Sequence, residues 1–219
     1  MLDYQLQGDV AIATLDDGKA NAVGHTFIDA VDESLQRANT EAKAICLVGR
    51  QGVFSGGFDL KELQKGEQER EALVRRGAEL LLRIFMHPQP VVVACTGHAV
   101  AAGAFVLLSA DTRIGALGDY KIGLNETAIG LTLPVFGFEL SKARLSPRYH
   151  SAAVTQAQLY DASQAMEVGF IDSAVALEEV VSSALEHAAS LSEIAGDAYA
   201  YNKTGIRQST ADAIAASLN

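Results

Sequence analysis

The sequence predicts an α/β fold in which helices cover a largely parallel sheet. Short apolar runs typical of buried strands alternate along the chain with longer stretches of helical periodicity. Helices between strands supply the right-handed crossovers that parallel pairing requires. The chain has 219 residues, of which 49% are hydrophobic and 20% charged, and this composition suits a globular protein with one well-buried core.

The predicted elements follow one another without a linker rich in Pro, Gly or Ser. A Gly8-Asp9 turn signal makes a hairpin of the first two strands, and Phe27, Val31 and Leu35 recur at helical spacing. In order, the sequence predicts strands at 4–7 and 10–15, a helix around 27–35, a strand at 44–48, an amphipathic helix at 71–85, strands at 91–95 and 113–116, and helices from 177 onward.

One uncharged run, from Pro88 to Ala110, is nearly long enough to cross a bilayer. Pro90 followed by three valines is typical of a buried strand, and Thr96-Gly97-His98 interrupts the run before helix-forming residues continue at 99–108. We therefore expect a strand followed by a buried helix.

The whole chain is expected to form one domain with a helical tail. Residues 1–190 are predicted to make up the core domain, and residues 191–219 a C-terminal helical segment. Because residues 201–219 are polar, they must dock on the body of the protein or on a neighbouring subunit to be ordered.

Charge and cysteine content narrow the range of partners and compartments. The net charge of −10 argues against nucleic acid as a partner, and any anionic ligand must be met by local cations or backbone N–H groups. Cys46 and Cys95 lie in apolar runs and are expected to be free core residues, which favours a reducing compartment. The first residues show neither the basic nor the apolar part of a secretory signal, so we expect a cytoplasmic location without membrane insertion.

Two glycine-containing junctions and one isolated carboxylate carry the chemical signals. The junctions are residues 52–62 and 97–105, where glycines let a ligand approach the backbone and a helix begins with free N–H groups. Asp59 is either a helix cap or part of a binding loop, and His98 is interpreted as a turn or core histidine. Glu126 is the only ionisable residue between Ile122 and Phe138.

The isolated carboxylate of Glu126 is consistent with two roles, one structural and one catalytic. Asn125 is a good N-cap residue, and a glutamate in the first turn of a helix favours the positive end of its dipole. Alternatively, Glu126 is a buried base whose pKa is shifted for catalysis.

Several other kinds of site lack support in the sequence. No His, Cys and carboxylate residues have metal-ligand spacing, and no Gly-x-Ser-x-Gly elbow occurs, so we expect neither a metal nor serine chemistry. The glycine spacing fits neither a dinucleotide fingerprint nor a phosphate-binding P-loop.

Taken together and in this order, three segments resemble motifs of the crotonase superfamily, also called the enoyl-CoA hydratase/isomerase family. The likeness covers roughly residues 10–175. Lys19-Ala20-Asn21-Ala22 resembles the segment near the adenosine of coenzyme A, Phe54 to Leu60 the first oxyanion-hole motif, and Pro90 to Asp111 the second.

The resemblance implies a fold, an assembly and a binding site. The fold would be a spiral of ββα units with a shortened helical C-terminal segment, assembled as a homotrimer or a dimer of trimers. The backbone N–H groups of Phe58 and Ala102 would hold the thioester oxygen of an acyl-CoA, and coenzyme A would be part of the substrate, with no separate cofactor. The positions implied to bind the CoA or acyl part are Lys19, Ala20, Ala22, Gly56, Gly57, Asp59, Leu60, Lys61, Gly103 and Phe105.

The resemblance also implies which reaction is catalysed. Hydratases of the family use two glutamates, and the matching positions here are Phe105 and Glu126, so one acid is absent. The segment from Ile122 to Leu131 is similar to Δ3,Δ2-enoyl-CoA isomerases, which work with a single glutamate. We therefore expect Glu126 to move a proton between C2 and C4; hydration or another CoA-thioester reaction, or a non-catalytic acyl-CoA-binding subunit, are the alternatives.

Overall fold

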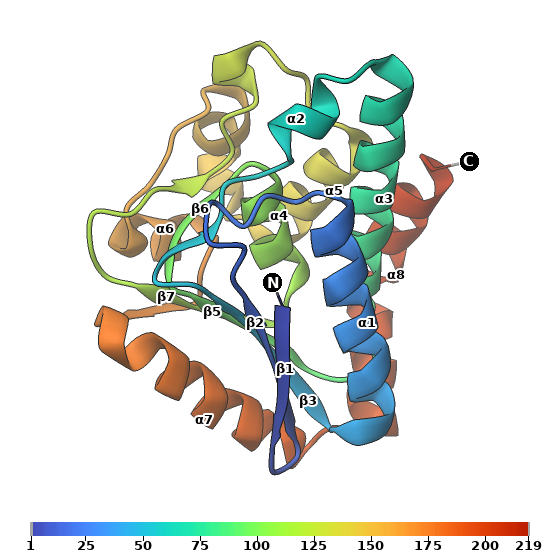
Figure 1. Cartoon of the computed structure of the whole chain (residues 1–219), viewed down its shortest axis with the longest axis vertical. Coiled ribbons are helices and arrows are strands. Elements are labelled where there is room, and N and C mark those ends of the chain that lie inside the picture. The colour runs from blue at the N-terminus through green and yellow to red at the C-terminus, as the bar shows by residue number, and fades with distance from the viewer. Residues whose placement is uncertain (1, 219) are drawn as a thin grey trace.

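The described residues form two sheets, of which the larger has six strands in the order β1-β2-β3-β5-β7-β9. The strands β1, β2, β3, β5 and β7 are labelled in Figure 1. The computed structural model describes residues 2–218. Only β1 runs antiparallel to its neighbour, and every other pairing in this sheet is parallel, as the sequence predicts. The strands are β1 (Leu2–Gln7), β2 (Val10–Leu15), β3 (Ala44–Gly49), β5 (Val91–Cys95), β7 (Thr112–Ala116) and β9 (Ser173–Val175).

Helices cover both faces of this sheet. Helix α7 packs against β2, β3, β5 and β7 on one face and lies at the lower left of Figure 1, while α1, α3 and α4 lie on the other side. The helices are α1 (His25–Glu41), α2 (Leu60–Leu63), α3 (Glu67–Phe85), α4 (Ala102–Ser109), α5 (Val135–Arg144), α6 (Ala162–Val168), α7 (Val180–Ser192) and α8 (Asp197–Ala216). Short 3-10 turns occur at η1 (Thr127–Ile129), η2 (Pro147–Tyr149) and η4 (Leu177–Glu179), and a π-helical turn at η3 (Ser151–Thr155).

The strands are apolar on both faces because both faces are buried. Ile45 and Leu47 join the core cluster shared with α1, α3 and α4, whereas Cys46 and Val48 join the cluster beneath α7. This two-sided burial explains why the central strands appear in the sequence as continuous apolar runs. Cys46 and Cys95 are free and buried, and burial raises the pKa of each thiol to about 12, which confirms them as core residues.

A second, smaller sheet was not predicted from the sequence. It consists of β4 (Gly52–Ser55), β6 (Gly97–Val100) and β8 (Ile122–Gly123), all parallel. The expectation of a helix from 99 to 108 is therefore wrong at its start, because the first two of these residues belong to β6 and α4 begins at Ala102. A Cβ on Gly97 would lie 2.0 Å from the carbonyl carbon of Gly52, so only glycine permits this pairing.

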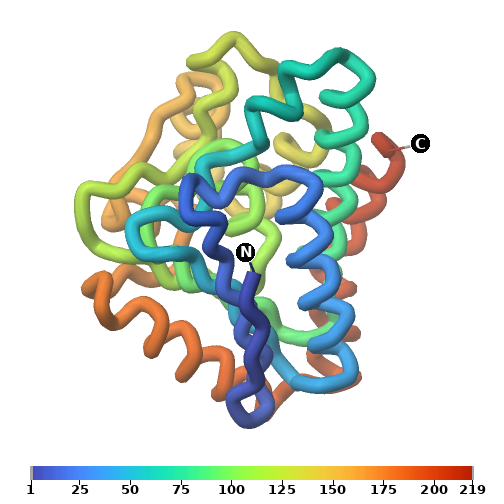
Figure 2. Tube along the Cα trace, in the orientation of Figure 1, coloured from blue at the N-terminus to red at the C-terminus, as the bar shows by residue number. Residues whose placement is uncertain are grey.

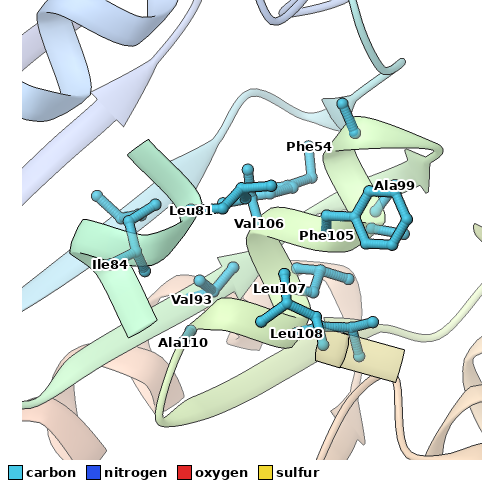
Figure 3. Close-up of a cluster of buried hydrophobic side chains, with 14 of the residues drawn as sticks. Phe54, Leu81, Ile84, Val93, Ala99, Phe105, Val106, Leu107, Leu108 and Ala110 are labelled. Carbon is cyan, nitrogen blue, oxygen red and sulfur yellow. The ribbon is translucent and has the colours of Figure 1, made fainter. Parts of the chain in front are cut away.

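Helix α4 is buried on all sides. Every residue from Ala102 to Ser109 is buried, and Figure 3 shows Val106 and its neighbours on α4 lying among Leu81 and Ile84 of α3 and Val93 of β5. The uncharged run at 88–110 is thus divided among β5, β6 and α4. No helix in the described part of the chain has the length and apolar character needed to cross a membrane.

The C-terminal helix α8 docks on the body of the same chain. It lies beside α3 and α5, as the trace in Figure 2 shows for α3. Lys203 Nζ lies 2.7 Å from Asp111 Oδ2 and Arg207 Nη2 lies 2.9 Å from Asp111 Oδ1, and all three side chains are largely buried. Burial lowers the pKa of Lys203 to about 8. Ion pairs with the core therefore hold the polar tail, while the domain boundary at residue 190 stays a prediction.

Candidate active site

The three strands of the smaller sheet end at the same edge. Because β4, β6 and β8 are parallel, the segments that follow them emerge side by side, in the position where parallel sheets bind ligands. A Cβ on Gly57 would lie 3.0 Å from Ala101 Cβ and 3.5 Å from the nitrogen of Ala102, so the two glycine-containing junctions touch. The nitrogen of Ala101 donates to the carbonyl of Gly123 at 3.0 Å, which joins the third strand end.

The segment after β4 presents the N–H group of Phe58. Phe58 forms an isolated parallel β-bridge with Val23. In this bridge the nitrogen of Val23 donates to the carbonyl of Gly57 at 2.8 Å, and the nitrogen of Asp59 donates to the carbonyl of Val23 at 3.2 Å. The N–H of Phe58 lies between these two groups and so faces away from Val23, and it donates to no acceptor within residues 2–218. The Phe58 ring lies over Gly77 of α3, where an added Cβ would be 2.5 Å from Cε1.

The segment after β6 presents the N–H group of Ala102, the first residue of α4. The first backbone bond of this helix runs from the nitrogen of Phe105 to the carbonyl of Ala101 at 3.1 Å, which leaves the N–H groups of the first turn without helical acceptors. Ala101 has φ 52° and ψ −122°, a conformation that costs a non-glycine residue energy and that persists only where the surroundings enforce it. Two unpaired backbone donors on touching segments are the elements of an oxyanion hole.

Glu126 follows the third strand end and is 9% exposed. Burial raises the pKa of its carboxyl, an effect that the backbone N–H groups of Asn125 and Glu126 partly offset. Its Oε2 atom is buried and makes no hydrogen bond to any described residue. A buried acid with a raised pKa and a free oxygen is suited to accept a proton from a ligand.

The capping explanation for this segment is wrong. Asn125 Oδ1 is buried without a hydrogen-bond partner, and the residue before the 3-10 turn η1 is Glu126, whose side chain makes no capping bond. The turn is only three residues long, and the carbonyl of Glu126 accepts from the nitrogens of Ile129 and Leu131 at 3.1 and 2.9 Å. The turn therefore closes through its own backbone.

Phe105 lies in the core behind the site. It is 1% exposed, and its ring packs edge to face with Phe136 at 5.4 Å between centroids. A Cβ on Gly137 would lie 2.9 Å from Phe105 Cζ, so α5 approaches the ring closely. Contact between Phe105 and an acyl chain stays a prediction.

The segment that resembles the adenosine-binding motif lies beside the first junction. The nitrogen of Gly56 donates to the carbonyl of Ala20 at 2.8 Å, and Lys19 and Ala20 are exposed there. Ala22 and Asp59 both line a cavity of about 240 Å³. Asp59 also caps α2, accepting from the nitrogen of Lys61 at 2.9 Å, so the capping interpretation of this residue is confirmed.

The remaining predicted positions fall around these junctions. Gly103 packs against β4, where an added Cβ would be 2.4 Å from the carbonyl oxygen of Ser55. Leu60 and Lys61 are exposed on α2. His98 accepts from the nitrogen of Lys121 at 2.9 Å through Nδ1, so its ring is satisfied as expected, although it lies in strand β6 and not in a turn. Within residues 2–218, no three His, Cys, Asp or Glu side chains are grouped to hold a metal ion.

Sequence reasoning assigned no role to two residues that shape this region. Arg50 Nε donates to the carbonyl of Lys19 at 2.6 Å, which brings a second cation to the motif. Asn21 is buried with φ 47°, and its Nδ2 donates to the carbonyls of Leu15 and Phe54 at 2.8 and 3.1 Å. An asparagine between two alanines in a turn is a usable signal for this conformation, whereas nothing near Arg50 in the sequence indicates its contact.

Comparisons with known proteins agree with this architecture. A family model described as enoyl-CoA hydratase/isomerase matches residues 5–219. The crystal structure of a family protein from Pseudomonas syringae is 39% identical with a TM-score of 0.97, and the match covers 99% of this chain and 94% of that one.

Two sequence relatives have different names. The human mitochondrial enoyl-CoA delta isomerase 1 is 29% identical over 207 residues, which cover 92% of this chain and 68% of that protein. A probable enoyl-CoA hydratase from Bacillus subtilis is 32% identical over 148 residues, which cover 66% of this chain and 55% of that protein. The mixed α/β fold and the matching of almost the whole chain lead to one conclusion: this protein is a member of the enoyl-CoA hydratase/isomerase family, with the crotonase fold that its motifs resemble.

Proposed function

We propose that this chain is a Δ3,Δ2-enoyl-CoA isomerase. The observation that carries the proposal is a single buried carboxylate with a free oxygen, Glu126, at the edge where two unpaired backbone donors emerge. Phe105 occupies the position at which the resemblance places the other acid of a hydratase, and its ring is packed in the core. One carboxylate suffices to move a proton, whereas adding water requires both positioning and proton delivery.

The proposed reaction has two proton transfers. The Glu126 carboxylate removes a proton from C2 of a 3-enoyl-CoA, and the electron pair moves into a dienolate whose oxygen accepts from the N–H groups of Phe58 and Ala102. The same carboxyl group then returns the proton to C4, which gives the 2-enoyl thioester and restores the base. Each oxyanion donor contributes about 3 kcal/mol to lowering the barrier. No separate cofactor takes part.

One groove of the molecule is suited to the acyl end of such a substrate. A groove of about 590 Å³ lies between α3, α5 and the end of α8, lined in part by Val74, Ala78, Phe136 and Leu218. It suits an acyl chain because these side chains are apolar.

We further propose that the protein forms a homotrimer or a dimer of trimers and lies in the cytoplasm. The family resemblance supports the assembly, and the free cysteines support the compartment.

The second candidate function is hydration of a 2-enoyl-CoA, which the name of the Bacillus subtilis relative favours. Separate incubation of the protein with a 3-enoyl-CoA and a 2-enoyl-CoA distinguishes the two. We expect the 3-enoyl substrate to be converted to the 2-enoyl product, with little water added to either. Rapid formation of the 3-hydroxy thioester from the 2-enoyl substrate would instead establish a hydratase, and coenzyme A binding without turnover a non-catalytic subunit.

Isomerase activity is expected to fall as the pH is lowered, and the acid side of the pH profile should reflect the titration of one group. Glu126 works as a base only when ionised, and burial raises its pKa above the ordinary value of 4.5. Activity is therefore full above the raised pKa and is lost as the pH falls through it, at milder acidity than for an exposed glutamate. The measurement is kcat/KM against pH, with circular dichroism at each pH to show that the fold persists. A rate that stays constant down to pH 4.5 would contradict Glu126 as the base.

Arg50 is expected to bind the phosphates of coenzyme A together with Lys19. Among the carboxylates of residues 2–218, 11 of the 17 Lys and Arg residues find an ion-pair partner and six do not, and Lys19, Arg50 and Lys61 are among these six. Replacing Arg50 by alanine should raise KM for an acyl-CoA about fivefold and leave kcat nearly unchanged, as for loss of uniform binding. Arg148→Ala, an exposed arginine on η2, is the matched control.

A truncated substrate makes this prediction specific. The N-acetylcysteamine thioester of the same acyl group has no phosphates, so Arg50→Ala should leave its KM unchanged. An equal rise in KM for the truncated thioester would show that Arg50 acts on the fold of the motif and not on phosphate.

A further inference from the structure

Glu126 lies on a segment with little secondary structure of its own. Between β8 and Pro134, the residue that precedes α5, residues 124–133 contain only the three-residue turn η1. This turn is closed by bonds from the nitrogens of Ile129 and Leu131 to the carbonyl of Glu126, and from Gly130 to Thr127 at 3.2 Å. Residues 126–131 are therefore bonded to one another as one unit, and the position of the Glu126 carboxylate depends on the position of that unit.

One hydrogen bond ties this unit to the rest of the described chain. Across residues 2–218, the only hydrogen bond from residues 124–133 to a residue outside β8 and α5 runs from Thr127 Oγ1 to the carbonyl of Val154, at 3.0 Å. Buried Leu124 and Leu133 hold the two ends of the segment by packing, which restrains position but gives little directional control. The hydroxyl next to the base therefore supplies the directional contact.

The acceptor of this bond lies in an unusual and well-supported turn. Val154 belongs to the π-helical turn η3, a geometry that often occurs at functional sites. The chain that follows η3 returns to β8, where Ile122 and Tyr160 exchange two backbone bonds of 2.9 Å. The segment from η3 to Tyr160 thus contacts the base-carrying segment at Thr127 and the strand that precedes that segment at Ile122.

The hydrogen bond from Thr127 to Val154 affects the base because one oxygen of Glu126 is free. Its Oε2 has no hydrogen-bond partner, so no other side chain fixes the direction of that oxygen. The direction of the carboxylate then depends on the position of its backbone, and displacements of about 1 Å can lower catalysis about a hundredfold. We infer that Thr127 is a positioning residue for the base: its hydroxyl holds the Glu126 turn against η3 so that the carboxylate reaches C2 and C4. The inference rests on the proposed isomerase function.

The test compares Thr127→Val, Thr127→Ala and Thr127→Ser in the isomerase assay with a 3-enoyl-CoA. The valine and alanine variants lose the donor, and we expect kcat to fall about tenfold or more with KM within about twofold. The serine variant keeps the hydroxyl and should retain most of the wild-type kcat. Because Glu126 remains ionisable in a similar environment, the acid limb of the pH profile should keep its position while the rate falls at every pH.

The matched control is Thr40→Val. Thr40 Oγ1 also donates to a backbone carbonyl, that of Arg37 at 3.1 Å, and it lies in the last turn of α1. This variant should turn over like the wild type, and thermal unfolding of all four variants shows whether each remains folded. Wild-type kcat in folded Thr127→Val or Thr127→Ala, or a serine variant as impaired as the valine variant, would overturn the positioning role. A wild-type protein without isomerase activity would instead reject the proposed function.

Discussion

Replacing Glu126 by glutamine should lower the rate of isomerisation about a thousandfold or more, because general base catalysis is lost while the shape of the side chain is kept. The direct measurement is exchange of the C2 proton of an enoyl-CoA with solvent deuterium, which reports on the base whatever the product. Glu186→Gln, an exposed glutamate on α7, is the matched control and should exchange at the wild-type rate.

The stability of this variant should change in the opposite direction to its activity. Burial raises the pKa of Glu126 in the folded state, so ionisation of this group disfavours folding at any pH above that pKa. The glutamine variant carries no charge there and should be at least as stable as the wild type at pH 8, with the difference shrinking as the pH falls. Near-wild-type exchange by a folded Glu126→Gln protein would remove Glu126 from the mechanism.

Replacing Gly103 by alanine should destabilise the fold by about 3 kcal/mol and abolish most activity, because overpacking against backbone forces the elements apart. The added Cβ would lie 2.4 Å from the carbonyl oxygen of Ser55 and 2.8 Å from its Cβ. Helix α4 can accept it only by moving away from β4. That movement separates the N–H of Ala102 from the N–H of Phe58, and loss of one oxyanion donor alone lowers kcat about a hundredfold to a thousandfold.

A glycine-to-alanine substitution at an open position of a helix should raise the stability of the protein instead of lowering it. Gly205 lies within α8 with open space around its Cβ position, so Gly205→Ala should stabilise the protein by about 0.5 to 1 kcal/mol through helix propensity. Chemical denaturation of both variants, with kcat measured in parallel, provides the comparison. A Gly103→Ala protein as stable and active as the wild type would show that the contact between α4 and β4 is not needed.

The sequence predicted the elements whose burial leaves a local pattern. The valines of β5 and the periodic residues of α1 sit in or against a covered sheet, so their apolar spacing is visible without the structure. The smaller sheet left no such pattern. Its strands are two to four residues long and contain glycines, and they form because segments far apart in the chain pair through their backbones.

The candidate site likewise has residues that the sequence predicted and contacts that it did not. Residues 58, 102 and 126 were located through the ordered motifs of a family resemblance, and the structure brings the segments that carry them to one edge of one sheet. Their roles in catalysis stay predictions. The contacts of Thr127 with Val154 and of Arg50 with Lys19 join residues 27 and 31 positions apart, so no local pattern could reveal them.

The packing of Phe105 has a consequence for how this enzyme can change over evolutionary time. A carboxylate at this position would replace a ring that now lies edge to face with Phe136 and closely over Gly137. Burying an unpaired charge costs several kcal/mol, a large part of the 5 to about 15 kcal/mol that keeps a typical domain folded. A lineage could therefore gain a second acid here only if α5 were remodelled first or at the same time. A change of reaction at this site and a change of core packing around Phe105 would therefore have to occur together in this chain.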